Sequence, residues 1–179
     1  QYPRAIYTLW SEAERNAIGI YTIVYDDTNK KDKRWFTNTN QSYAYDASAG
    51  TVTATYGTAT AKAHADANAT DDDGVDLDPV VVIEGLKTKL IRTVKVQAAD
   101  ELARTDWYIT RNAEKSTAIP SAITTHRDLV RSKQATMETQ ITNASNTPAL
   151  ETLYNYVNTA EEGEPKVFER PLAELPTLD

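Results

Sequence analysis

Residues 78–116 read DPVVVIEGLKTKLIRTVKVQAADELARTDWYITRNAEKS, and their pattern predicts a long amphipathic helix. Asp78 suits the cap of a helix start, and Pro79 suits the first helical position, where proline is tolerated. Apolar side chains then recur at spacings of three and four, at Ile83, Leu86, Leu90, Val94, Ala98 and Leu102. At about 1.5 Å per residue, about thirty residues would form a rod of roughly 45 Å. We expect the rest of the chain to pack against this rod or to extend from its ends.

A second helix is expected at residues 120–143, with an apolar stripe made of Ile123, Val130, Met137 and Ile141. The loop at residues 116–119 is so short that it predicts an antiparallel helix pair. The side chains expected to face each other are Leu90 and Val94 on the first helix and Val130 and Met137 on the second. A third, short helix is expected at residues 149–158, after a break at Asn146–Pro148.

The N-terminal part has the pattern of a small β module. Ser11 and Glu14 stand at the two positions of a capping box, which predicts a short helical turn there. A short strand is expected just before it, from Thr8. Further strands are expected from their β-branched and aromatic residues at 20–25, from Trp35, and as a β-hairpin at 43–46 and 51–56.

Between the two parts, alanine, threonine, asparagine and aspartate dominate, and large apolar residues are scarce until Val75. Such a segment cannot bury enough apolar surface to fold alone, so it is expected to be a mobile, protease-sensitive connector. The predicted fold class is therefore α+β. The predicted regions are a β module at 1–57, an acidic linker at 58–78, a helical hairpin with a short helix at 79–160, and an extended, proline-containing tail at 161–179.

The acidic run at residues 71–78 invites comparison with a calcium-binding loop. With Gly74 at the sixth position of an EF-hand loop, Ala69 stands at the first position and Val80 at the twelfth, where a bidentate glutamate belongs. The run therefore favours a solvated acidic linker over a calcium site. No metal ligand or cofactor-binding residue is predicted, and a calcium-dependent accessory role ranks low among the functions considered.

Catalysis is not expected from this sequence. The chain has two histidines, His64 in the linker and His126 on the second predicted helix, and neither lies beside a nucleophile or a glycine-rich elbow. The glycines form no phosphate-binding motif. We therefore predict no catalytic residue and no cofactor, and a hydrolytic accessory role ranks low.

Composition limits the partners. The net charge of −7 argues against a nucleic-acid partner, because binding to phosphates requires a basic surface. No run of eighteen apolar residues is present, so no membrane span is expected. The first ten residues lack the basic-then-apolar layout of a secretory signal, and the absence of cysteine excludes disulfides and thiolate metal sites.

Three short motifs resemble those of small tail proteins of tailed bacteriophages, namely tail-fibre assembly chaperones and tail-associated virion proteins. LARTDW, at residues 102–107, resembles their LAxTDW element. Ala118–Ile123 followed by His126–Arg131 resembles their IPxxxxxYRxxLR element, with His126 where an aromatic residue is common. TLWSEAERNAIGIYTI, at residues 8–23, resembles their LTxxERxxLGIYxV element. One departure is that the Trp-Pro pair frequent near the C-terminus of these families is replaced by Leu175–Pro176 and its neighbours.

The resemblance implies a non-enzymatic structural component of a phage tail or baseplate, an adaptor for a tail fibre or a neighbouring tail protein. Its partners would be other tail, baseplate or fibre proteins or further copies of itself, and its location the virion, after synthesis in the host cytoplasm. The alternative is a tail-fibre assembly chaperone that is absent from the mature virion.

Candidate interface residues come from the tail and from the TDW motif: Phe168, Leu172, Leu175, Leu178 and Trp107. The apolar tail residues are separated by prolines, so they form an extended strip that something must cover. Either a partner covers the strip, or the tail folds back along its own helices. Trp107 either anchors a partner or, as the sequence favours, closes the helix end by packing on the second helix.

Overall fold

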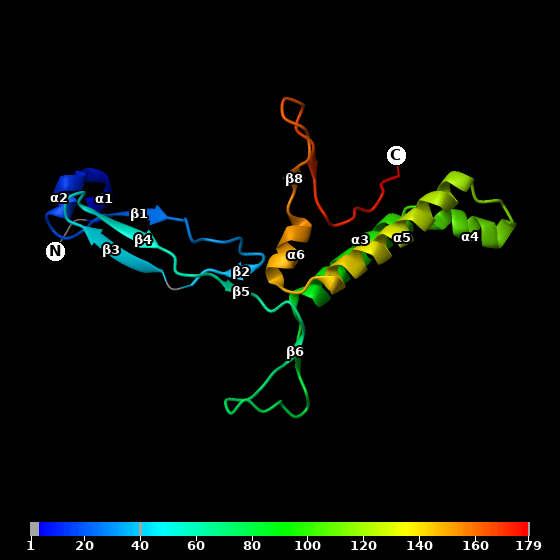
Figure 1. Cartoon of the computed structure of the whole chain (residues 1–179), viewed down its shortest axis with the longest axis horizontal. Helices are drawn as coiled ribbons and strands as arrows, with labels where there is room; N and C mark the ends of the chain where they lie inside the picture. Colours follow the sequence, from blue (N-terminus) through cyan, green and yellow to red (C-terminus); the bar gives the residue numbers. More distant parts are fainter. Residues whose placement is uncertain (1–3, 40, 179) are drawn as a thin grey trace. The chain divides into compact units, whose positions relative to one another are not determined.

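The computed structural model describes residues 4–39 and 41–178, which form two compact units, residues 1–61 and 62–179 (Figure 1). The first unit is built mainly of strands and the second mainly of helices, so the predicted α+β class is confirmed.

Among its described residues, the N-terminal unit contains two short helices and five strands. Their bounds are α1 Ile6–Leu9, α2 Glu12–Asn16, β1 Thr22–Asp26, β2 Phe36–Thr37, β3 Ser42–Asp46, β4 Thr51–Thr55 and β5 Thr60–Ala61. β4 lies in the middle of a three-stranded sheet, parallel to β1 and antiparallel to β3, while β2 pairs with β5. The hairpin predicted around residues 47–50 is therefore confirmed. The strand predicted from Thr8 is wrong, because these residues belong to α1.

Local chemistry explains the start of α2. The Ser11 hydroxyl accepts a hydrogen bond from the Glu14 amide, and the Glu14 carboxylate accepts one from the Ser11 amide at 2.8 Å. The predicted capping box is thus present, and it satisfies amides that would otherwise lack partners at a helix start. The core of this unit is small: it consists of Ile6, Trp35, Phe36 and Ala54.

The C-terminal unit contains four helices and two β-ribbons among its described residues. Their bounds are β6 Ala67–Asn68, β7 Val82–Ile83, α3 Leu86–Ala103, α4 Asp106–Lys115, α5 Ser121–Asn143, α6 Thr147–Tyr154, β8 Val157–Asn158 and β9 Phe168–Glu169. β6 pairs with β7, and β8 pairs with β9. The core side chains lie on α3, α5, α6 and the tail, at Val94, Ala98, Ile123, Val130, Met137, Ile141, Leu150 and Leu172.

The first long helix starts later than predicted. It begins at Leu86, not at Asp78–Pro79, and residues 82–83 form strand β7. Its cap comes from a distant segment: the Asp66 carboxylate accepts hydrogen bonds from the Gly85 amide at 2.7 Å and from the Thr88 hydroxyl. The carbonyl oxygens of Ala63 and His64 accept from the amides of Leu86 and Lys87. Residues 63–66 therefore belong to the C-terminal unit. The expectation that proteases cleave preferentially within residues 57–77 stays a prediction.

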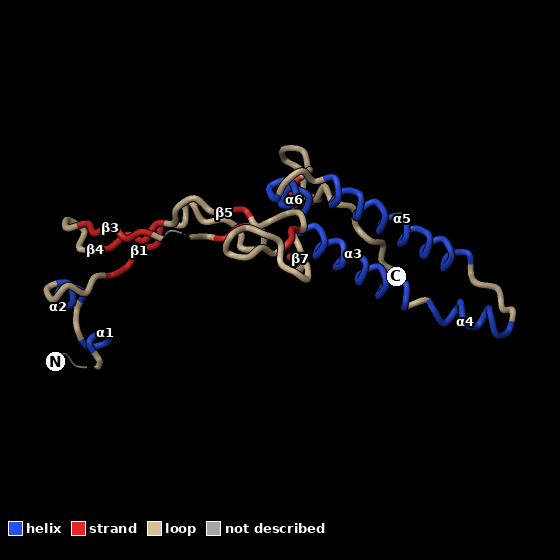
Figure 2. The backbone as a smooth tube through the Cα atoms, turned by 90° about the horizontal axis from the view of Figure 1, so that it is seen from below, coloured by secondary structure: helices blue, strands red, loops and turns tan. Residues whose placement is uncertain are grey.

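The predicted rod is also broken at Thr105, where α3 ends and α4 begins. α3 and α5 nevertheless form the predicted antiparallel pair, and both backbone views show them side by side (Figures 1 and 2). Lys87, at the start of α3, donates to the carbonyl of Thr142 at the end of α5. At the other end of the pair, Glu101 contacts His126. Val94, Val130 and Met137 are buried as expected, while Leu90 is only half-buried.

The tail from residue 170 onward folds back along its own helices. The Leu172 amide donates to the carbonyl of Leu153 at 2.9 Å, and the Ala173 amide donates to the side chain of Gln140. The Leu178 amide donates to the Glu101 carboxylate at 3.1 Å. For residues 170–178, the structure therefore shows the alternative in which the tail folds back along its own helices.

We expect Gly85→Ala to destabilise the C-terminal unit by about 1–2 kcal/mol, because a Cβ atom at this position would overlap the backbone of Ala65. The clash would push away the segment that caps α3. Thermal unfolding followed by the helical circular dichroism signal would measure the loss. As a control, Val96→Ala should leave the melting temperature nearly unchanged, because Val96 is 54% exposed on α3. Equal melting temperatures for Gly85→Ala and the parent would contradict the close approach.

Candidate functional site

Arg127 lies at the centre of a buried polar contact between α3, α4 and α5. Its Nη1 atom contacts three acceptors: the carbonyl oxygen of Leu102 at 2.8 Å, Thr105 Oγ1 at 2.7 Å and Asp106 Oδ1 at 2.9 Å. Arg127 is 8% exposed and Thr105 is fully buried. One guanidinium therefore fixes the corner between α3 and α4 against α5, and its charge is paired by Asp106.

Glu101 forms a second contact one turn away. Its carboxylate lies 2.9 Å from Arg104 Nη1 and 3.1 Å from His126 Nε2, and it accepts the Leu178 amide of the tail. Burial raises the pKa of Glu101, but the hydrogen bonds from Arg104 and Leu178 outweigh burial, so that its pKa lies below the ordinary value. The charged carboxylate thus ties α3, α5 and the tail together.

Glu101, Thr105, Asp106, His126 and Arg127 are called the helix junction below. The two motifs that carry the phage resemblance in this half of the chain, LARTDW and the HRDLVR segment, contribute four of its five residues. The structure brings these motifs together although their contacting residues are 21 to 25 positions apart in sequence. Because the junction residues are paired with one another and largely buried, we interpret the motifs as a structural joint.

The low pKa of Glu101 makes part of the stability of the C-terminal unit dependent on pH. A carboxylate whose pKa is lower in the folded state stabilises the fold above its unfolded value, about 4.3. This contribution is lost as the pH falls through the lower folded value. We therefore expect Glu101→Gln to lower the unfolding temperature at pH 7 and to have a smaller effect near pH 3. Equal effects of Glu101→Gln at both pH values would contradict a role for the charge.

The structure places the five predicted interface residues in different environments. Leu172 is 1% exposed and packs within its own unit, so this residue is not available to a partner. Leu175 and Leu178 are half-buried along the returning tail. Phe168 is 57% exposed and Trp107 is 52% exposed. Of the five, Phe168 and Trp107 thus have the most surface to offer.

Trp107 does not close the helix end as the sequence favoured. Its ring lies 3.8 Å from that of Tyr108, and the Arg111 guanidinium lies 6.0 Å from the ring centre, so the contacts described for the ring come from its own helix. The expectation that Trp107 is covered by the second helix is therefore wrong. Its role as a partner anchor stays a prediction.

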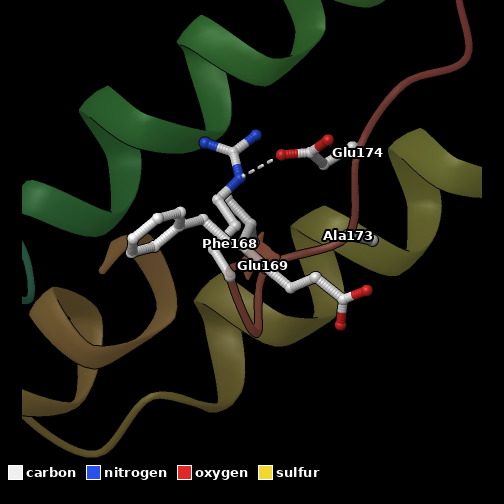
Figure 3. A pocket seen from close by; sticks show the side chains of 6 residues that line it. Phe168, Glu169, Ala173 and Glu174 are labelled. Carbon is white, nitrogen blue, oxygen red and sulfur yellow. Dashed lines mark ion pairs between the residues drawn. The ribbon is translucent and has the colours of Figure 1, made fainter. Parts of the chain in front are cut away.

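Phe168 lies at the edge of an open pocket of about 270 Å³ on the β9 strand and the tail that follows it (Figure 3). The residues that line the pocket are Phe168, Glu169, Arg170, Leu172, Ala173 and Glu174. Arg170 pairs with Glu174 at 3.0 Å across the pocket, and its guanidinium lies over the rings of Tyr154 and Tyr156. The pocket thus combines an exposed aromatic side chain with polar groups, as protein interfaces do.

Apart from Phe168, the exposed apolar side chains on the two β-ribbons were not among the predicted interface residues. On the β6–β7 ribbon and its turn they are Val75, Leu77, Val80, Val81, Val82 and Ile83, and on the β8–β9 ribbon they are Tyr156, Val157, Val167 and Phe168. The β-branched run at residues 80–83 could have indicated an exposed strand, but it was assigned to the first turn of a helix. An apolar run of this length is equally suited to a strand.

The acidic run at 71–78 forms the turn of the β6–β7 ribbon. The Asp71 carboxylate accepts hydrogen bonds from the amides of Asp73 and Val75, and Gly74 adopts a φ of +80° that favours glycine. Within residues 4–39 and 41–178, no cluster of three or more histidine or acidic side chains is placed to hold a metal ion. No helix in this described part of the chain is long and apolar enough to cross a membrane.

The helix junction and the exposed ribbons are thus the two features of the C-terminal unit from which a function can be argued. The first is a closed structural joint, and the second is open surface. Comparisons of the chain with protein-family models, with curated proteins and with solved structures found no match.

Proposed function

We propose that this protein is a non-enzymatic structural component of a bacteriophage tail or baseplate, where it acts as an adaptor for a tail fibre or a neighbouring tail protein. The resemblance of its motifs to those of phage tail proteins supports the phage assignment. The observation that carries the adaptor role is the exposed aromatic and aliphatic surface of the β8–β9 ribbon beside the tail pocket.

The pairing of β8 with β9 places the side chains of this surface. Asn158 lies opposite Phe168, so Tyr156 and Phe168 share one face of the ribbon. Tyr156 is 56% exposed, and its hydroxyl donates to Glu174 at the pocket. Two half-exposed aromatic rings beside an arginine form the kind of site at which a partner residue is anchored.

The helix junction and the packed tail give this surface a rigid support. The tail is held to α5 by Gln140, which donates to the carbonyl of Pro171 and accepts from the Ala173 amide. A binding site on a ribbon that is fixed at its base loses less conformational freedom when a partner binds. The acidic composition of the C-terminal unit favours a partner with a neutral or basic surface.

The experiment introduces Phe168→Ser into a phage that encodes this protein and measures the copies incorporated per purified particle by quantitative mass spectrometry. We expect Phe168→Ser to reduce incorporation while the isolated protein keeps its melting temperature, because the side chain is exposed. Val96→Ser is the matched control, since Val96 is 54% exposed on α3, away from the ribbon. Normal incorporation of Phe168→Ser, or an equal loss with Val96→Ser, would contradict the proposed site.

A further inference from the structure

Arg170 is held over two aromatic rings at the base of the β8–β9 ribbon. Its guanidinium carbon lies 5.8 Å from the centre of the Tyr154 ring and 5.5 Å from that of the Tyr156 ring. Val157 stands opposite Glu169, so one step further along the ribbon Tyr156 stands opposite Arg170. Cation–π contact with two rings restricts the guanidinium. Arg170 thus has a defined position on the ribbon.

The guanidinium of Arg170 has donors without acceptors. It carries five N–H donors in a planar fork. Its Nε atom lies 3.0 Å from Glu174 Oε1 and forms an ion pair, yet this buried nitrogen has no hydrogen bond of good geometry. The same Glu174 carboxylate already accepts the Tyr156 hydroxyl at 2.9 Å. Within residues 4–39 and 41–178, no acceptor is described for the two Nη atoms of Arg170.

The pocket beside Arg170 has room for one side chain of a partner. Its volume is about 270 Å³, whereas sites for drug-sized ligands occupy roughly 300–1,000 Å³. Phe168 stands two positions before Arg170, so both side chains belong to one face of the ribbon. The Glu169 side chain leaves the strand in a different direction from that of Phe168 (Figure 3). An exposed aromatic ring and a guanidinium with free donors are therefore neighbours on one face.

The chemistry of these groups selects a carboxylate as the ligand. A guanidinium fork matches the two oxygens of a carboxylate in bidentate geometry. A phosphate also fits an arginine, but it carries close to two negative charges. Glu169 and Glu174 line the pocket and the chain has a net charge of −7, so a doubly charged group is repelled more strongly than a carboxylate.

We propose that Arg170 binds a carboxylate of the partner protein, and that the apolar part of the partner segment packs against Phe168. This inference rests on the proposed adaptor function, because it names the chemistry by which the β8–β9 ribbon holds its partner. The carboxylate accepts from the Nη atoms, while Glu174 keeps its contact with Nε. A single carboxylate on an otherwise neutral or basic partner surface agrees with the acidic composition of this chain.

The test titrates the full chain, isotope-labelled, with N-acetylphenylalanine and follows binding by NMR. The matched probes are N-acetylphenylalanine amide, which lacks the carboxylate, and phenyl phosphate. We expect N-acetylphenylalanine to shift the Arg170 and Phe168 side-chain signals saturably, and the amide to bind at least about tenfold more weakly. Equal binding of the carboxylate and the amide, or tighter binding of phenyl phosphate, would overturn the proposal.

Variants assign the binding to Arg170. Arg170→Gln should weaken binding of N-acetylphenylalanine at least about tenfold, because it removes the charged fork. Arg111→Gln is the matched control: Arg111 is exposed on α4, lies 6.0 Å from the centre of the Trp107 ring, and its replacement should leave binding unchanged. Equal losses in the two variants would overturn the proposal.

A further variant covers the case in which Arg170→Gln fails to fold. Glu174→Gln should tighten binding of N-acetylphenylalanine at least about threefold, because it removes the carboxylate of the chain that competes for Arg170. Unchanged or weaker binding by Glu174→Gln would count against the site.

The outcome is separate from that of the incorporation experiment. Carboxylate binding at Arg170 together with normal incorporation of Phe168→Ser would support the carboxylate site and contradict the adaptor role. Reduced incorporation of Phe168→Ser without carboxylate binding at Arg170 would support the adaptor role and overturn the carboxylate site.

Discussion

Leu172→Ala should lower the free energy of unfolding of the C-terminal unit by about 2–5 kcal/mol, the range for buried leucines. Leu172 is 1% exposed, and its amide donates a hydrogen bond to the carbonyl oxygen of Leu153. Shortening the Leu172 side chain therefore leaves a cavity beneath the tail. Urea unfolding followed by the helical signal would report this loss, since most helical residues lie in this unit.

Phe168→Ala is the matched control for Leu172→Ala. It removes a larger apolar side chain four residues earlier, but one that is 57% exposed. We expect a change within about 1 kcal/mol for Phe168→Ala. A smaller effect of Leu172→Ala than of Phe168→Ala would show that the tail does not pack as described and that Leu172 is free to bind a partner.

The packing of Leu172 also changes the expected effect of deleting the tail on the stability of the helices. From sequence, deletion of residues 164–179 is expected to leave the helices intact, because the prolines suggest an independent extended strip. In the structure the same deletion would expose the core beneath Leu172 and remove the Leu178 amide from Glu101. We therefore expect destabilisation, so that point variants such as Phe168→Ser are the sharper probes of docking.

Arg127→Met should cost about 2–3 kcal/mol, because it removes a buried donor that serves three acceptors at the helix junction. Thr105 is fully buried, so its hydroxyl cannot replace the lost hydrogen bond with one to water. Asp106 is exposed, so its charge is partly screened, and the cost stays below that of breaking a fully buried ion pair.

Arg131→Met is the control for Arg127→Met. Arg131 lies one turn further along α5, pairs with Asp128 at 3.4 Å and is exposed. Its replacement should change the unfolding free energy by less than about 1 kcal/mol. Equal unfolding midpoints for the two variants in urea would contradict the role assigned to the junction.

Elements defined by local signals could be predicted from the sequence. The capping box of α2, the hairpin around residues 47–50 and α5, which follows Pro120, agree with the structure. The start of α3 could not be predicted, because a distant residue, Asp66, caps it. Asp78–Pro79 gave a competing local signal, and the β-branched run after it suited either a helix or a strand.

The candidate site was predicted in part. Thr105 and Arg127 belong to motifs that were noted in the sequence, but neither was predicted as a site residue, and their contact became visible only when α3 and α5 were placed together. The tail pattern showed an apolar strip, but it could not show that Leu172 points into the core while Phe168 points outward. The parallel pairing of β1 with β4 was not predicted, because the two strands lie far apart in sequence.

The measurement that tests the proposed function most directly is quantitative mass spectrometry of purified, tail-complete virions of a phage that encodes this protein. We expect a fixed number of copies per particle, retained through density-gradient purification and high salt. Abundant protein in infected cells together with its absence from purified virions would contradict the structural role and would favour the assembly chaperone.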